Sequence, residues 1–172
     1  MTTVSGNSTV KAGPWKQFLA VISHSGDSLV WLSLMIIVAL LGEAHWRNWA
    51  LTILVGMVAV GLLVKILKQI WRKQRPDGDW GGIYRRTDPY SFPSGHAARA
   101  AFLLTISLAL GPLLLGVLLL VWAPLVCYSR VYLRLHVWFE VICGFVLGSV
   151  SALILAMLVT WNPIDFSGLF AS

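Results

Sequence analysis

Residues 100–129 contain no charged side chain, and no other feature of the chain limits its possible folds so strongly. A transmembrane helix needs about 20 predominantly apolar residues, so the run could be a single long span. Gly111 and Pro112 interrupt it near its middle. Proline fixes its own φ angle and disfavours a helical conformation in the preceding residue, so we expect two helices joined by a tight turn. The first, ending at Leu110, is short for a full crossing, so it should begin at some depth in the bilayer, beside a protein cavity.

The composition of the 172-residue chain is typical of an integral membrane protein. Hydrophobic residues make up 58% of it and charged residues 12%, whereas soluble domains average about 45–50% and about 25%. The nine Trp residues suit the membrane interfaces. This composition excludes a disordered chain, a collagen and a disulfide scaffold. Cys127 and Cys143 lie in apolar runs and are expected to be buried small side chains rather than a disulfide.

Five apolar segments are predicted to cross the membrane, so the expected fold is an all-α integral membrane helical bundle. The segments are approximately residues 27–42, 48–72, 96–110, 113–135 and 137–161. After Pro14, apolar side chains recur at helical spacing, which predicts an N-terminal helix lying in the membrane interface. Residues 1–13 are small and polar and are expected to form a flexible tail, with residues 14–172 as a single domain.

The positive charge is concentrated in one part of the chain. The formal net charge is +6, and most of the 13 Lys and Arg residues fall between positions 65 and 99. Such clustering indicates an anionic partner. Because these cations stand beside apolar spans rather than on a soluble basic face, anionic lipid headgroups or a phosphorylated substrate are favoured over nucleic acid.

Four of these cations recur at helical spacing near the end of the second predicted span. Lys65, Lys68, Arg72 and Arg75 should therefore share one face of a helix that Pro76 stops. Cations at a helix end commonly extend to the membrane surface without further function. Alternatively they bind a phosphate, for which Arg supplies two parallel hydrogen bonds and Lys a mobile point charge.

A polar, Gly-rich segment, residues 77–92, leads into Pro93-Ser94-Gly95-His96. Ser94 is predicted to be the N-cap of the third span. A helix start offers unpaired backbone N–H groups and the positive end of the helix dipole, so it can bind an anion, and Gly95 allows close approach to the backbone. His96 would then stand beside the bound anion. The four residues could equally be no more than a cap.

The junction of the fourth and fifth spans reads Ser129-Arg130, then His136, then Glu140. Ionisable groups at the ends of apolar spans are costly and are functional candidates by default. Glu140 follows His136 by one helical turn, so its carboxylate can accept the Nδ1 proton and leave Nε2 free as a nucleophile or base. A structural pair whose members satisfy only each other is the simpler alternative.

The number of spans decides whether these clusters can form one site. With five spans, all three clusters emerge on the same face of the membrane. If residues 100–129 formed one span, the third cluster would lie on the opposite face. The Gly-Pro interruption is therefore required for a single site.

Together the clusters resemble the three-part signature of the type 2 phosphatidic acid phosphatase (PAP2) superfamily, membrane lipid phosphatases related to soluble vanadium-dependent haloperoxidases. The matching residues are Lys68 with six residues before Arg75-Pro76, then Pro93-Ser94-Gly95-His96, then Ser129-Arg130 with five residues before His136. One position departs from the pattern, because the family usually has Asp where this sequence has Glu140.

The resemblance implies a role for each matching residue. His136 would attack the phosphoryl group and form a phosphohistidine, with Glu140 holding its tautomer. His96 would protonate the leaving group and then act as base for water. The phosphate would be bound by Lys68, Arg75, Arg130 and the backbone near Ser94 and Gly95. No metal or other cofactor is expected.

The expected function is hydrolysis of a terminal monoester or pyrophosphate on a lipid such as a polyprenyl phosphate, phosphatidylglycerophosphate or phosphatidic acid. Transfer of the phosphoryl group to another lipid, or non-catalytic binding of anionic lipid, are the alternatives. Candidate headgroup contacts are Arg72, Arg85 and Arg86, with Trp80, Tyr84 and Tyr90 nearby. Asp77 and Asp79, in the same Gly-rich segment, are more simply solvated carboxylates than a metal site.

The expected location is the cell membrane. Five spans place the N-terminus and the site on one face, where the cations far outnumber Arg47 on the other, so the positive-inside rule favours a cytoplasmic site. Several of those cations are needed for the substrate, however, and many members of the family act on the outer face of a bacterial inner membrane.

Overall fold

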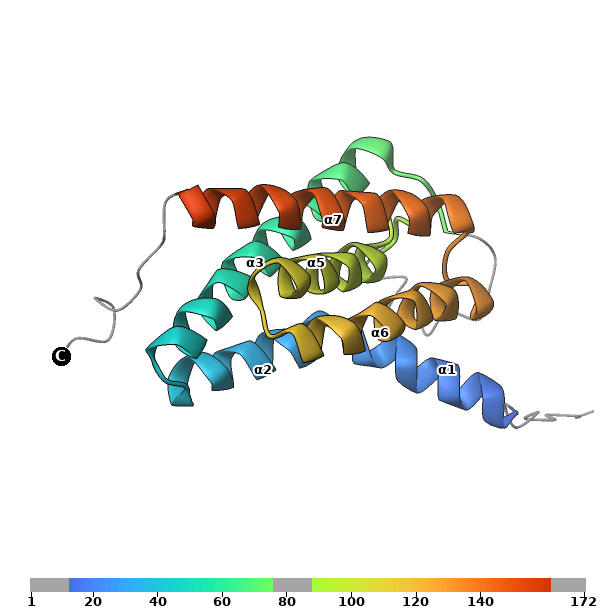
Figure 1. Cartoon of the computed structure of the whole chain (residues 1–172). Coiled ribbons are helices and arrows are strands. Elements are labelled where there is room, and N and C mark those ends of the chain that lie inside the picture. The colour runs from blue at the N-terminus through green and yellow to red at the C-terminus, as the bar shows by residue number, and fades with distance from the viewer. Residues whose placement is uncertain (1–12, 76–87, 162–172) are drawn as a thin grey trace, which may run out of the picture.

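The computed structural model describes residues 13–75 and 88–161 (Figure 1). These residues form six α-helices and one isolated antiparallel bridge between Gln74 and Tyr90. The helices are α1 Pro14–Ser25, α2 Ser28–Leu41, α3 Ala44–Trp71, α5 Gly95–Leu110, α6 Leu113–Tyr132 and α7 Trp138–Trp161. Apart from Gly13, the predicted flexible tail lies outside the described residues.

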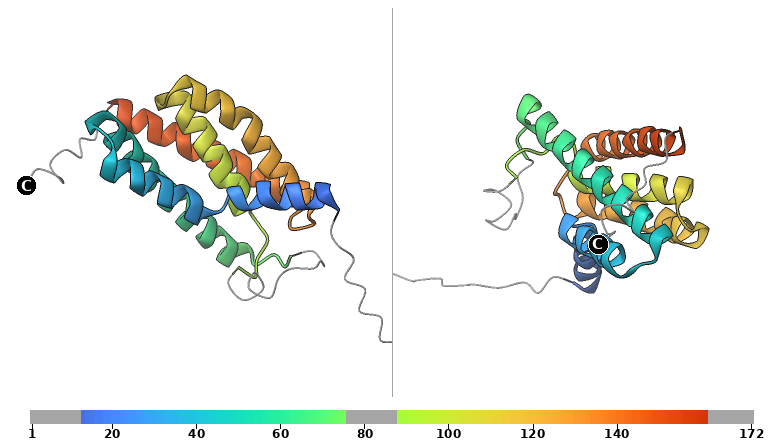
Figure 2. Two further views of the ribbon diagram at one scale, coloured as in Figure 1. Left: turned by 90° about the horizontal axis from the view of Figure 1, so that it is seen from below. Right: turned by 90° about the vertical axis from the view of Figure 1, so that its left-hand side faces the viewer.

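Helix α5 is the centre of the bundle. Most of its residues are buried, and it packs against α3, α6 and α7 (Figures 1 and 2). Two glycines of α7 allow this close approach. A Cβ atom at Gly148 would lie 1.9 Å from the backbone oxygen of Ala98, and one at Gly144 would lie 2.4 Å from that of Ser94. Small residues at a helix contact let the backbones of membrane helices pack directly.

The predicted class, an all-helical membrane bundle, is confirmed. Helices α3, α6 and α7 are long and apolar enough to cross a membrane, and α1 with α2, bent by 49°, forms a further candidate. Helix α5 has 16 residues, about 24 Å at 1.5 Å per residue, so it is as short as the sequence predicts. Large apolar side chains cover the outer faces of α2, α3, α6 and α7, where lipid would contact them.

The Gly-Pro interruption is confirmed. Helix α5 ends at Leu110, the N–H of Gly111 donates to the Ser107 carbonyl at 2.9 Å, and Pro112 is the N-cap residue of α6. As a result α5 and α6 are antiparallel neighbours. The end of α3, the start of α5, the end of α6 and the start of α7 all lie at one end of the bundle (Figure 1).

One predicted boundary is wrong. Helix α3 ends at Trp71 rather than at Pro76, because Arg72 adopts a left-handed conformation with φ 44° and closes the helix. Arg75 therefore lies beyond the helix, in the short segment that pairs with Tyr90, and does not share a helical face with Lys68.

Candidate active site

A tight turn between α6 and α7 places His136. The backbone N–H groups of Leu135 and His136 both donate to the Arg130 carbonyl, at 2.9 and 3.1 Å. Arg134 takes a φ of 56° to make the turn. The chain thus folds back over the end of α6 and buries the imidazole, which is 3% exposed.

Glu140 fixes the orientation of that imidazole. Nδ1 of His136 donates to Oε2 of Glu140 at 2.9 Å, and the other carboxylate oxygen accepts from Ser91 Oγ at 2.7 Å and Lys73 Nζ at 3.0 Å. An ionised carboxylate only accepts hydrogen bonds, so the proton is assigned to Nδ1 and Nε2 keeps its lone pair. The buried pair therefore leaves Nε2 as the unprotonated nitrogen.

The electrostatic surroundings keep His136 neutral at pH 7. Burial lowers the pKa of His136 to about 4, and the charges of Arg130 and Arg75 act in the same direction, against the hydrogen bond to Glu140. A neutral imidazole is the form that can attack an electrophile.

Lys68 and Arg75 converge on one carboxylate. Lys68 Nζ donates to Oδ1 of Asp88 at 2.7 Å and Arg75 Nη2 donates to Oδ2 at 2.5 Å. Arg75 also donates through Nε to the Asp88 carbonyl at 2.9 Å, and its Nη1 lies 3.5 Å from Nε2 of His136. The two cations thus hold an oxyanion group beside the unprotonated nitrogen of His136.

Arg130 is almost fully buried. Its Nη1 donates to Ser23 Oγ of α1 at 2.6 Å. Its charge acts on both His96 and His136. Helix α1 therefore contacts a residue of the site. Its predicted role as a helix in the membrane interface does not include this contact.

The start of α5 differs in one detail from its prediction. Ser94 is the N-cap residue, as predicted, but its side chain makes no capping hydrogen bond, and its buried Oγ has no partner among the described residues. Its backbone N–H donates to the Glu140 carbonyl at 3.1 Å, which joins α5 to the first turn of α7.

His96 lies in the first turn of α5 and has a carboxylate of its own. Its Nε2 donates to Oδ1 of Asp27 at 2.7 Å, and Arg99 Nη2 donates to its Nδ1 at 3.4 Å. Gly95 directly precedes it. The nearest groups to a Cβ atom at Gly95 would be the flexible Arg99 guanidinium, at 3.3 Å, and a Val64 methyl group, at 3.5 Å.

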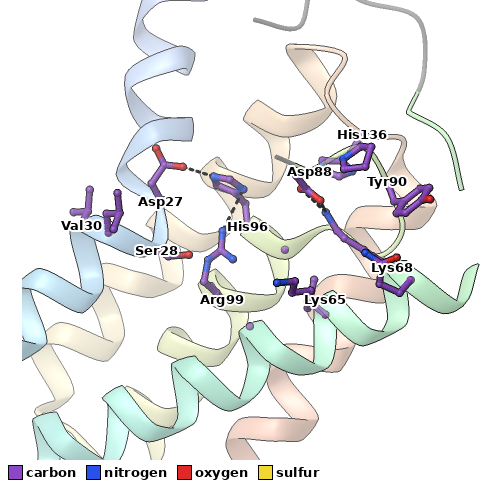
Figure 3. Close-up of a pocket in the computed structure, with 16 residues that line it drawn as sticks. Asp27, Ser28, Val30, Lys65, Lys68, Asp88, Tyr90, His96, Arg99 and His136 are labelled. Carbon is purple, nitrogen blue, oxygen red and sulfur yellow. Dashed lines mark hydrogen bonds and ion pairs between the residues drawn. The ribbon is translucent and has the colours of Figure 1, made fainter. Parts of the chain in front are cut away.

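A cavity of about 680 Å³ joins these groups. Its polar wall includes Lys68, Asp88, His96, Arg99 and His136, as Figure 3 shows. Residues of all three predicted clusters thus meet. The remaining predicted residues, Arg75, Ser94, Arg130 and Glu140, hold or adjoin the residues that line the cavity.

The predicted headgroup contacts are only partly described. Arg72 is exposed, its Nε donates to the Gln69 carbonyl at 3.1 Å, and it is not one of the residues that line the cavity. Tyr90 does line the cavity. Arg85, Arg86, Trp80, Tyr84, Asp77 and Asp79 lie outside the described residues. Among residues 13–75 and 88–161, no group of three or more His, Cys, Asp or Glu side chains could hold a metal ion.

Sequence reasoning missed three charged residues that line the cavity, Asp27, Asp88 and Arg99, and also Lys73, which contacts the Glu140 carboxylate. Arg99 had a usable signal, because it follows His96 by three residues and so shares its helical face. Asp27 is a charge at the start of an apolar span, which also marks a candidate.

Comparison with known proteins agrees with this geometry. A curated undecaprenyl-diphosphatase of Sulfolobus acidocaldarius is 27% identical over 150 residues, which cover 85% of this chain and 71% of that protein. The crystal structure of a transmembrane PAP2 type phosphatidylglycerolphosphate phosphatase from Bacillus subtilis matches with a TM-score of 0.73 and 26% identity, covering 91% of this chain and 82% of that one. The family model of the PAP2 superfamily matches residues 49–164, which include all three clusters. The chain therefore belongs to the PAP2 superfamily.

Proposed function

We propose that this protein is a membrane lipid phosphatase that removes the terminal phosphate of a lipid monophosphate or a lipid pyrophosphate through a phosphohistidine. The observation that carries the proposal is the placement of His136. Its Nδ1 is held by the buried Glu140, and its Nε2 faces the oxyanion position between Lys68 and Arg75. A pair that served only structure would not need an unprotonated nitrogen at an anion site.

The proposed reaction has two steps. Nε2 of His136 attacks phosphorus as the bond to the leaving oxygen breaks, and His96 gives that oxygen a proton. His96 then takes a proton from the water that attacks the phosphohistidine, which releases phosphate. Lys68, Arg75 and Arg130 stabilise the charge on the equatorial oxygens, so no metal or other cofactor is part of the proposal.

The walls of the cavity suit a lipid whose phosphate carries an alkyl chain. Charged side chains line one part, and Leu29, Val30 and Val64 line another. The relatives are described as acting on undecaprenyl diphosphate and phosphatidylglycerolphosphate. We accordingly propose polyprenyl diphosphates and monophosphates, phosphatidylglycerophosphate and phosphatidic acid as the substrate class.

The protein is a multi-pass membrane protein, and we propose the cell membrane as its location, with the site on the cytoplasmic face. An impermeant thiol reagent applied to intact cells tests the face, with a cysteine introduced at position 82. Efficient labelling there would place the site outside.

The test of function is phosphate release by the purified chain in detergent, measured with a panel of these lipids. We expect turnover of at least one lipid and none by the His136→Ala variant. Analysis of the products then separates the two enzymatic possibilities, because a phosphotransferase yields a second phosphorylated lipid instead of free phosphate. If no lipid of the panel is hydrolysed while anionic lipid still binds, the protein is a binder rather than an enzyme.

A further inference from the structure

Two imidazoles face the cavity, and each is hydrogen-bonded to a carboxylate. Glu140 holds His136 from within the same motif, but the partner of His96 comes from the α1–α2 junction, 69 residues away in sequence. Oδ1 of Asp27 accepts the Nε2 hydrogen bond of His96 at 2.7 Å, and Figure 3 shows the two side chains facing each other in the lining of the cavity.

The geometry points to Asp27 as a positioning residue for His96. We propose that its carboxylate fixes the ring with the proton on Nε2, directs Nδ1 toward the leaving oxygen of the substrate, and stabilises the imidazolium that protonates that oxygen. The inference rests on the proposed function, because it requires His96 to act as the general acid.

The side chain of Asp27 does not cap the helix that it precedes. Asp27 is the N-cap residue of α2, but it makes no capping hydrogen bond. Its second oxygen, Oδ2, accepts instead from Nδ1 of His24 at 3.0 Å. Both oxygens are therefore held by imidazoles, which fixes the plane of the carboxylate.

The junction that carries Asp27 is itself anchored against α5 and α6. Trp122 Nε1 donates to Ser25 Oγ at 2.8 Å, and Trp31 Nε1 donates to the Ser25 carbonyl at 2.9 Å. A Cβ atom at Gly26 would lie 3.0 Å from Val126 and 3.4 Å from the His96 ring. Glycine therefore allows the junction to approach the ring closely enough for Asp27 to reach Nε2.

The proton balance closes without any proton on Asp27. In the first step His96 acts as the imidazolium, whose Nδ1 carries a proton in place of the hydrogen bond that it accepts from Arg99 in the structure. That proton passes to the leaving oxygen, which takes the electron pair of the breaking P–O bond while the P–N bond to His136 forms. In the second step Nδ1 takes a proton from the attacking water as the P–N bond breaks. The Nε2 hydrogen bond persists, and the Asp27 charge stabilises the imidazolium, in opposition to the nearby charges of Arg99 and Arg130.

The test is the dependence of rate on leaving group in Asp27→Asn, using the full chain purified in detergent. The leaving group of a lipid monophosphate is an alkoxide, which leaves poorly without a proton, whereas that of nitrophenyl phosphate is a nitrophenolate, which leaves without needing one. General acid catalysis contributes about 10²–10⁴-fold, and the variant keeps His96 but loses its charged partner, so we expect kcat/KM for the lipid to fall about 10-fold or more. The rate with nitrophenyl phosphate should change less than about 3-fold, and Asp27→Glu should restore part of the loss.

A matched control and two further variants make the outcome decisive. Glu43→Gln also replaces an N-cap carboxylate without a capping bond, at the start of α3, and should leave both rates unchanged.

His96→Ala tests the proposed function itself: if its activity falls equally with both substrates, His96 is not the general acid. If His96→Ala shows the leaving-group dependence and Asp27→Asn loses both substrates equally or neither, only the role of Asp27 is wrong. If Asp27→Asn does not fold, His24→Ala is measured instead, because it removes the second imidazole that holds Asp27. A fall in kcat/KM for the lipid alone supports the proposal, and an equal fall for both substrates, or none, contradicts it.

Discussion

The carboxylate of Asp88 occupies the position where we propose that phosphate binds. It accepts hydrogen bonds from both Lys68 and Arg75, beside Nε2 of His136. A phosphate or a vanadate that enters the site must displace this carboxylate. Asp88→Asn removes the competing charge and keeps the backbone carbonyl that Arg75 Nε also uses, so we expect the variant to bind such anions more tightly.

The size of the effect follows from the exposure of the pair. A hydrogen bond to a charged group contributes about 1.5–3 kcal/mol when buried, and an exposed ion pair contributes at most about 1 kcal/mol. The Asp88 side chain is 37% exposed, whereas those of Lys68 and Arg75 are 8% and 7% exposed, so the pair lies between these limits. A net competition of about 1–2 kcal/mol corresponds to about 5–30-fold tighter anion binding.

The assay is inhibition of lipid phosphate hydrolysis by vanadate and by inorganic phosphate. For Asp88→Asn both inhibition constants should fall about 5–30-fold, and the gain should shrink at high salt because Asp88 is partly exposed. Glu43→Gln, which removes a carboxylate at the other end of α3, should not change either constant. Unchanged or weaker inhibition in Asp88→Asn would refute the reasoning, because the carboxylate would then not compete with the anion.

Four further predictions concern the proposed mechanism. His136→Ala should abolish turnover of every substrate, and acid-quenched wild-type samples should carry an acid-labile, base-stable phosphate that this variant lacks. Glu140→Asp should keep substantial activity and Glu140→Gln should lose much of it, since the carboxylate must stabilise the charged ring; equal kcat/KM values in both would contradict this. Because the pKa of His136 is lowered from 6.5 to about 4, the unfolded chain binds more protons between these values, so stability from this group is lost as the pH falls through them; a ¹⁵N NMR titration should find His136 neutral at pH 6. Hydrolysis should persist in excess EDTA, and complete loss that Mg²⁺ restores would contradict a metal-free site.

The overall fold could be predicted because the membrane leaves few choices. An uncharged run that contains Gly111 and Pro112 must either be one unusually long span or break there, and only the break puts all the clusters at one end of the bundle. Helix ends were harder to place. Arg72 closes α3 in a left-handed conformation, and a non-glycine residue in this conformation has no clear sequence signal.

The candidate site could be predicted only where its partners are close in sequence. The spacing of His136 and Glu140 by one helical turn predicts their hydrogen bond, and the structure contains it. Asp27 and Asp88 contact their cationic or imidazole partners across 69 and 20 residues. Such contacts depend on how the helices pack, and no periodicity along the chain indicates that packing.

The contacts of Glu140 show how the site accommodates a side chain longer than the family's usual aspartate. Glu140 reaches Nδ1 of His136 with one oxygen, and its extra length lets the other oxygen contact Ser91 and Lys73, on the two segments that flank residues 76–87. The same residue accepts the N–H of Ser94 on its backbone carbonyl. One residue in the first turn of α7 therefore sets the tautomer of the proposed nucleophile and holds the first and second clusters against the third. For this reason loss of its charge should disturb the reaction more than loss of one methylene group.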